Sequence, residues 1–251
     1  MAQLMRTSNP ALSDQAFQGE HAAFGETMTL QGTANKTGIL LLCAMATAAW
    51  TWNIYLHSNS PEAVYPLGIL GVIGGLIAAI VTIFKKSWAP VTAPLYALLE
   101  GLVLGMVSSI FEARFPGIAI QAVSLTFGTL LMLLLAYRTG VIRVTEKFRL
   151  GVVAATGGIA LFYFLTFILS LFHINAFQSV YAAGAIGIGF SIFVVIVAAL
   201  NLVLDFDFIE TGVNSGAPKY MEWYGAFGLM VTLIWLYLEI LRLLSKLRSR
   251  D

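Results

Sequence analysis

Acidic side chains inside long apolar runs are the residues of this chain most able to do chemistry. Asp205 and Asp207 close the run FSIFVVIVAALNLVLDFDFIE, residues 190–210, and Glu100 lies in the middle of PLYALLEGLVLG. A charge at the centre of a bilayer costs at least about 2.5 kcal/mol, so an acid in such a place is a candidate functional residue. Asp205 and Asp207 have a second interpretation, in which they only mark the point where a helix leaves the membrane.

The two aspartates are predicted to point in different directions. They are two positions apart, about 200° around a helix, so both cannot face one ligand while the helix stays regular. Asp205 shares a face with Asn201, one turn earlier, and this pair is expected to look inward. If the helix unwinds at this end, Asp205, Asp207 and Glu210 could converge with backbone carbonyls on calcium, a hard cation that prefers oxygen ligands.

Two further acids lie inside apolar segments. Glu100 either faces a water-filled cavity or is held protonated by its surroundings. Glu239 lies seven residues beyond Thr232 and therefore on the same helix face. It could extend toward the membrane surface or pair with Arg242 three positions later.

Composition places the chain among polytopic membrane proteins. Of its 251 residues, 59% are hydrophobic and only 11% are charged, whereas about a quarter are charged in soluble domains. The balance of 14 Lys and Arg against 13 Asp and Glu offers no basic face for nucleic acid. The single cysteine, Cys43, excludes an intrachain disulfide. No Ser/His/Asp set or histidine pair is visible in the apolar segments, so we expect neither an enzyme nor a bound cofactor.

The chain is expected to fold as an all-α bundle of seven transmembrane helices behind a polar arm. Residues 1–36 form the arm, residues 37–244 the membrane domain and residues 245–251 a basic tail. Backbone amides in lipid must be satisfied within their own segment, so each apolar segment of about 20 residues is predicted to be a helix. These segments are 37–56, 64–84, 92–111, 117–137, 150–172, 179–204 and 223–244.

Lysine and arginine gather on the side of the expected bundle that holds the N-terminus. Short basic loops resist translocation, so this side is predicted to be cytoplasmic, and loop 138–149 is the strongest signal. The basic residues between 242 and 250 fall on the opposite side if the last segment spans the membrane, and on the same side if it turns back. We favour seven spans. The residues of the basic side are Arg6, Lys36, Lys85, Lys86, Arg138, Arg143, Lys147, Arg149 and Lys219.

Small residues four positions apart predict the faces on which helices touch. Such pairs let backbones approach closely where no hydrophobic force drives helices together. The pairs are Gly71 with Gly75, Gly101 with Gly105, and Ala183 with Gly187.

Several short motifs resemble a known family. The runs LNLVLDFDFI, AFGLMVTLIWLYLEILRLL and EGLVLG are similar to those of the Bax inhibitor-1/YccA family, and the opening RTSNPALS resembles its bacterial YccA-type branch. This resemblance implies a seven-helix protein of the bacterial inner membrane. It also implies a pH-sensitive calcium leak channel, in which an aspartate of the sixth helix pairs with one of the seventh and protonation or an arginine partner switches the gate.

The resemblance carries over only in part. The sixth-helix aspartate falls on Asp205, but its seventh-helix partner falls on Thr232, so the pair of acids is not reproduced. The basic residue near the end of the second helix falls at Ile83, with Lys85 and Lys86 just beyond. Asn201, Thr232, Lys85 and Lys86 are therefore only supporting candidates.

We hypothesise that acids elsewhere replace the missing partner. Asp205, assisted by Asp207 and Glu100, would form the ion-binding and pH-sensing site, and Glu239 is a further candidate. Two carboxylates close together in a low-dielectric setting titrate as a unit, and calcium would compete with protons for their oxygens. Asp205 and Asp207 are the candidate calcium ligands.

Two other functions remain open at this stage. The chain could be a non-transporting regulator that binds a quality-control protease or another membrane complex, a role that the long N-terminal arm would suit. It could also be a proton-coupled transporter, with Glu100 and Asp205 relaying protons. The expected surroundings in each case are the lipid bilayer and cations.

Overall fold

The computed structural model describes residues 26–58, 60–174 and 177–250, and within them the predicted all-α fold is confirmed. Seven helices are long and apolar enough to cross a membrane. They are α1 (Leu30–Ser58), α2 (Tyr65–Phe84), α3 (Ala89–Arg114), α4 (Ile118–Arg138), α5 (Glu146–Leu171), α7 (Ala185–Asn214) and α8 (Met221–Arg248). Three short elements connect them: η2 (Pro61–Ala63), η3 (Lys86–Trp88) and α6 (Gln178–Tyr181).

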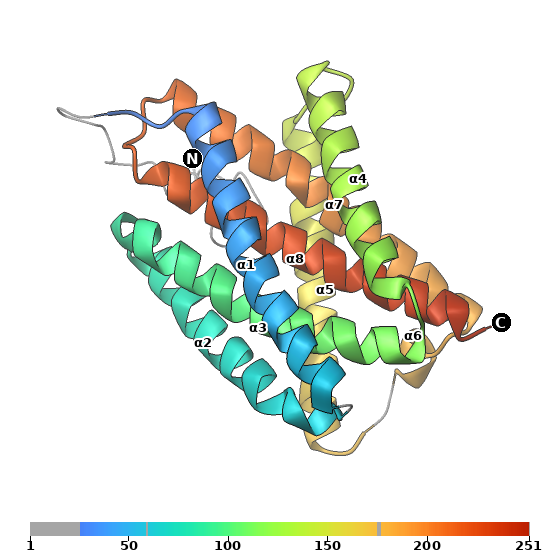
Figure 1. Cartoon of the computed structure of the whole chain (residues 1–251). Coiled ribbons are helices and arrows are strands. Elements are labelled where there is room, and N and C mark those ends of the chain that lie inside the picture. The colour runs from blue at the N-terminus through green and yellow to red at the C-terminus, as the bar shows by residue number, and fades with distance from the viewer. Residues whose placement is uncertain (1–25, 59, 175–176, 251) are drawn as a thin grey trace.

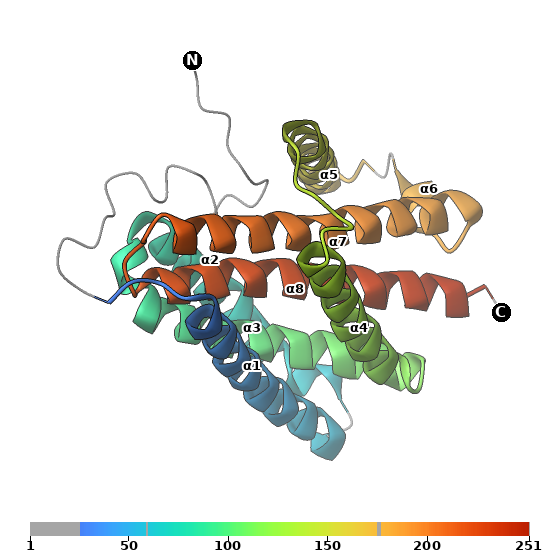
Figure 2. The ribbon, with the colours of Figure 1, turned by 90° about the horizontal axis from the view of Figure 1, so that it is seen from above.

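Helix α8 occupies the centre of the bundle. It packs against α1, α3, α4 and α7, and Figure 2 shows it between α7 on one side and α1 and α3 on the other. In α8, 67% of the most apolar stretch is buried inside the protein, whereas in α5 only 11% of the corresponding stretch is buried. The outer helices therefore turn most of their apolar surface to the surroundings, as lipid-facing helices do.

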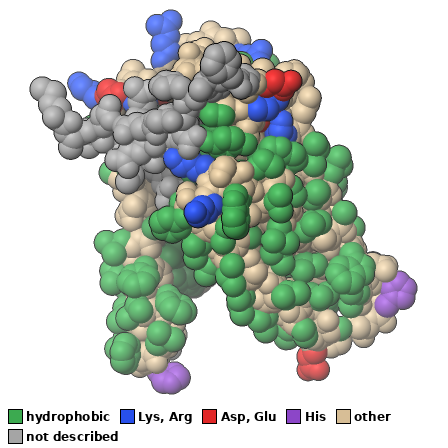
Figure 3. Space-filling view, turned by 90° about the vertical axis from the view of Figure 1, so that its left-hand side faces the viewer, with side chains coloured by type: hydrophobic (Ala, Val, Ile, Leu, Met, Phe, Trp, Pro, Cys, Tyr) green, Lys and Arg blue, Asp and Glu red, His purple; other side chains and the backbone are tan. Residues whose placement is uncertain are grey.

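The successive spans alternate in direction, which defines two ends of the bundle (Figure 1). The end at which α1 and α8 begin and α7 finishes is called the N-side here, and the opposite end the far side. Figure 3 shows lysine and arginine side chains gathered at one end of the molecule, above a broad belt of hydrophobic side chains. This distribution is the one expected of a helix bundle that crosses a bilayer.

Close helix contacts form at the glycines that the spacing predicted. A Cβ at Gly101 would lie 2.0 Å from the Thr47 hydroxyl oxygen and 2.3 Å from the Ala44 carbonyl oxygen, both in α1. A Cβ at Gly71 would lie 2.5 Å from the carbonyl oxygen of Leu99 in α3. Gly187 differs, because its close neighbours are the carbonyl oxygens of Ser179 and Val180 in α6 and of Ala182 just after it, rather than another span.

Several helix boundaries differ from the expected ones. Helix α1 begins at Leu30, so the last seven residues of the expected arm are helical, and α8 runs on to Arg248 through most of the expected tail. The sixth apolar segment is divided into α6 and α7 by a bend at residues 182–184. Helix α7 then continues ten residues past position 204, and its extension buries Asp205 while Glu210 is exposed.

The basic residues near the C-terminus belong to the bundle. Lys246 is 6% exposed, and its ammonium donates hydrogen bonds to the carbonyl oxygens of Val180 and Gly187 and to the Ser191 hydroxyl. Arg248 donates to the carbonyl oxygen of Pro116 in the turn before α4. These charges therefore hold neighbouring turns in place.

We expect Gly101→Ala to destabilise the protein by about 1–3 kcal/mol, since the added methyl group would overlap the backbone of α1. Gly128→Ala is the matched control, because a Cβ there meets nothing within 4 Å. Thermal unfolding of the purified proteins in detergent compares the two. Equal unfolding temperatures would show that α1 and α3 do not touch at Gly101.

Candidate functional site

Asp205 and Asn201 lie together on the buried face of α7, as their spacing predicted. Asp205 is 0% exposed and Asn201 is 2% exposed. The Asn201 amide donates 2.8 Å hydrogen bonds to the Thr156 hydroxyl of α5 and to the Val197 carbonyl oxygen one turn earlier. A buried polar strip therefore runs along α7 at the level where α5 crosses it.

Asp207 also contacts α5, nearer the N-side than Asn201 does. Its Oδ2 atom accepts a 2.9 Å hydrogen bond from the Arg149 guanidinium, which also donates a 2.7 Å bond to Glu146. Arg149 is buried, and its two acidic partners lie on either side of it, one in α5 and one in α7. Breaking one partner of such a buried pair usually costs several kcal/mol, so this contact fixes α5 against α7.

Glu210 follows the same pattern at the end of α7, where its carboxylate accepts a hydrogen bond from the Tyr137 hydroxyl of α4. Asp205, Asp207 and Glu210 thus point in three directions along a regular helix. The condition under which they could converge on one calcium ion, an unwound end of α7, is not met in this structure. Among the residues that the structure describes, no group of three or more His, Cys, Asp or Glu side chains could hold a metal ion.

Glu239 is buried in α8 and pairs with Arg242, which was one of the two predicted arrangements, the other being extension toward the membrane surface. Arg242 donates 2.8 and 3.0 Å hydrogen bonds to the carboxylate, and the Tyr163 hydroxyl of α5 donates one of 3.1 Å. Because α7 and α8 run antiparallel from the turn at residues 215–220, Asp205 is level with Met230. Glu239 is therefore about 13 Å further along α8, at 1.5 Å per residue. Thr232, which donates to the Gly228 carbonyl oxygen, is the candidate nearest that level.

Glu100 lies on α3 and faces α2. A Cβ on Gly75 would be 2.9 Å from the Glu100 carboxylate oxygen, so the small glycine makes room for the acid. The side chain is half-buried. Glu100 thus faces α2, whereas Asp207 faces α5. That Glu100 and Asp207 assist Asp205 in one acidic site stays a prediction.

The supporting lysines lie at the N-side turn between α2 and α3. Lys85 is exposed at the end of α2, and Lys86 is half-buried at the start of η3. Their position matches the basic end that loop charges predicted.

A further buried acid, Glu222, was not among the predicted site residues. It lies in the first turn of α8 and is 0% exposed. Its carboxylate accepts 2.9 and 2.8 Å hydrogen bonds from the Thr29 amide and hydroxyl at the start of α1, and it binds the Lys36 ammonium. Lys219 lies 3.3 Å away, and this contact raises the pKa of the Lys219 ammonium above its ordinary value. The Glu222 carboxylate, in the first turn of α8, thus caps the N-terminus of α1.

The chain around Glu222 is shaped to admit it. A Cβ on Gly32 would lie 2.1 Å from the carboxylate, so only glycine fits at that position of α1. The segment before α1 runs beside the turn before α8, with the Met28 amide donating to the Ala217 carbonyl oxygen at 2.7 Å. An acid in the first turn of the last apolar segment was the sequence signal for this site, because carboxylates are stabilised near helix N-termini.

The fold and its buried acids define a seven-helix integral membrane protein that carries ionisable groups on the two most buried helices, α7 and α8. A family model described as Bax inhibitor 1 like matches residues 9–249, nearly the whole chain. The protein therefore belongs to the Bax inhibitor-1 family, which confirms the resemblance of its short motifs. No curated protein and no solved structure matches the chain.

We expect Glu222→Gln to lower the free energy of unfolding by about 3 kcal/mol, because it leaves the Lys36 ammonium beside a neutral group in a buried site. Glu62→Gln, at an exposed position in η2, is the control and should change stability by less than about 0.5 kcal/mol. Unfolding of the detergent-solubilised protein reports both values. The assignment is wrong if Glu222→Gln is as stable as its control.

Proposed function

We propose that this protein is a pH-sensitive cation leak, with calcium among the ions carried, and that Asp205 is the acidic residue on the ion path. The observation that carries the proposal is the complete burial of the Asp205 side chain, within a membrane-spanning helix and against the central helix of the bundle. A carboxylate is tolerated there at a high cost in solvation energy, and such residues usually mark ion or proton routes.

The position of Asp205 suits a site that ions reach from the N-side. Asp205 lies nine residues before the end of α7, about 13 Å along the helix axis at 1.5 Å per residue. The basic loops and the ion pairs of Asp207 and Glu222 lie between this level and the N-side surface. A cation arriving from that surface would exchange its water for carboxylate and carbonyl oxygens near Asp205, as hard cations do.

The ion pair of Asp207 with Arg149 provides the gate in this proposal. Asp207 holds α5 through Arg149, whereas the several donors around Glu222 keep α1 fixed against α8. Protonation of the Asp207 carboxylate would remove the charge that binds Arg149 and so free α5 to move against α7. The same protons would compete with calcium at Asp205, which links conduction to pH without requiring the pair of aspartates seen in the family pattern.

We expect Asp205→Asn to lower calcium flux at least about tenfold, which corresponds to about 1.4 kcal/mol for an ion stabilised by a carboxylate. The measurement is uptake into liposomes that contain the purified protein and a calcium-sensitive dye, recorded from pH 6 to pH 8. Asp207→Asn should retain flux but change its dependence on pH, since it opens the contact with Arg149 and leaves Asp205 in place.

Glu62→Gln again serves as the control, with unchanged flux expected. Flux that is equal in the wild type and Asp205→Asn would contradict the assignment of Asp205. A wild-type protein that is folded but carries no ions would instead favour the non-transporting regulator, which should then co-purify with a membrane complex.

A further inference from the structure

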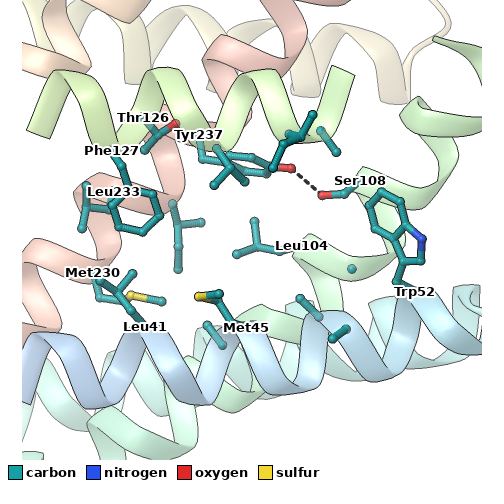
Figure 4. A pocket seen from close by; sticks show the side chains of 18 of the residues that line it. Leu41, Met45, Trp52, Leu104, Ser108, Thr126, Phe127, Met230, Leu233 and Tyr237 are labelled. Atoms are coloured by element: carbon teal, nitrogen blue, oxygen red, sulfur yellow. Dashed lines mark hydrogen bonds between the residues drawn. The ribbon is translucent and has the colours of Figure 1, made fainter. Parts of the chain in front are cut away.

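A long apolar groove runs between α1 and α4, with α3 and α8 forming its floor (Figure 4). Its volume is about 550 Å³. Leu41 and Met45 project into it from α1, Phe127 from α4 and Leu233 from α8. Figures 1 and 2 show the positions of α1 and α4 on this face of the bundle, and exposed lining residues such as Met45 and Ile120 leave the groove open on its outer side.

The open side of the groove faces the hydrocarbon of the membrane. All four helices that form it are candidate membrane spans, and the lining side chains Met45 and Ile120 are 57% and 67% exposed. The hydroxyls of Ser108 and Tyr237 lie on its wall and are 2.6 Å apart, bonded to each other. Such an apolar space offers water few partners and stays dry. Its contents must therefore come from the lipid.

The groove lies in the far-side half of the bundle and ends close to positive charge. Trp52, in the last part of α1, lines it, and an indole ring prefers the headgroup layer. Next to the lining residue Ile120, Gln121 accepts a 2.9 Å hydrogen bond from the Arg248 guanidinium. Arg114 is exposed at the end of α3, just before the same turn. Two guanidinium groups thus flank the turn between α3 and α4. One carboxylate, Glu112, also lies at this turn and accepts hydrogen bonds from the Gly117 and Ala119 amides. The net charge of these three side chains is positive, so a lipid phosphate would find a charge complement there.

We propose that this groove binds one acyl chain of a phospholipid with an anionic headgroup, which the arginines at the α3–α4 turn hold. One half of the hydrocarbon core is about 15 Å thick, so a chain inserted from the far side reaches along the groove from Trp52 toward Met230. The volume lies within the range of about 300–1,000 Å³ that is typical of small-molecule sites. The site is separate from the acids of α7 and does not depend on the proposed ion flux.

Retention of lipid by the purified protein tests the groove. Protein reconstituted in vesicles of equal parts phosphatidylglycerol and phosphatidylcholine is extracted into mild detergent, and bound lipid is counted by native mass spectrometry. We expect the wild type to retain one phospholipid, with phosphatidylglycerol favoured at least fivefold. Ala49→Trp fills the groove from an exposed lining position and should lower the occupancy at least tenfold.

Ala160→Trp is the matched control, an exposed position on α5 outside the groove, and it should retain lipid like the wild type. Thermal unfolding establishes that both variants are folded. Arg248→Gln should keep the bound chain and lose the preference for phosphatidylglycerol. Equal retention by Ala49→Trp and Ala160→Trp would overturn the groove as the site. Equal binding of both lipids by the wild type would overturn the role of the arginines.

Discussion

The structure depends on the pairing of charges inside a bundle that has little water to solvate them. Glu222, Asp207 and Glu239 each meet a basic side chain within hydrogen-bonding distance. Two of these contacts join different helices: Glu222 of α8 to α1, and Asp207 of α7 to α5. An ion pair in a low-dielectric interior is favourable only when its geometry and remaining hydrogen bonds are good. The acids therefore determine how the helices sit against one another.

The buried acids fall into two groups: those that hold helices together, and Asp205, which is proposed to lie on the ion path. Glu222 and Glu239 are surrounded by donors from several residues, which suits a fixed position. Asp205 lies on the same buried face of α7 as Asn201, whose amide is bonded to α5. The acid that the proposal places on the ion path thus lies on a buried segment, and the Asp207–Arg149 pair nearer the N-side surface is the one that opens in the proposal.

The sequence predicted the architecture well, because a helix that spans a membrane needs a long apolar run and little else. The seven spans, the contact at Gly101 and the inward direction of Asp205 and Asn201 all follow from spacing along one chain. The pairing of Glu239 with Arg242 could be predicted for the same reason, since the two are one turn apart.

Contacts between distant segments could not be predicted in this way. The partners are far apart in the sequence in two ion pairs, Asp207 with Arg149 and Glu222 with Lys36. The local sequence around one residue of such a pair does not identify the other residue. The bend before α7 was missed because the residues at 182–184 are small and apolar, so hydropathy runs through them. Glu100 was grouped with Asp205 on the cost of its burial alone. The energetic cost of burial indicates that a buried acid has a role, but it does not predict which helix the acid faces.

The central place of α8 has a consequence for how the protein is made. This helix leaves the ribosome after the other six spans, yet it fills the middle of the bundle and supplies partners for α1, α5 and the turn at α6. Helices α1, α2 and α3 pack extensively against one another and can associate before α8 arrives. Until then Lys36 and the carbonyls around Val180 lack their final neighbours. Completion of the fold is a late event, and the interval before it is when chaperones and proteases of the membrane can act on the chain.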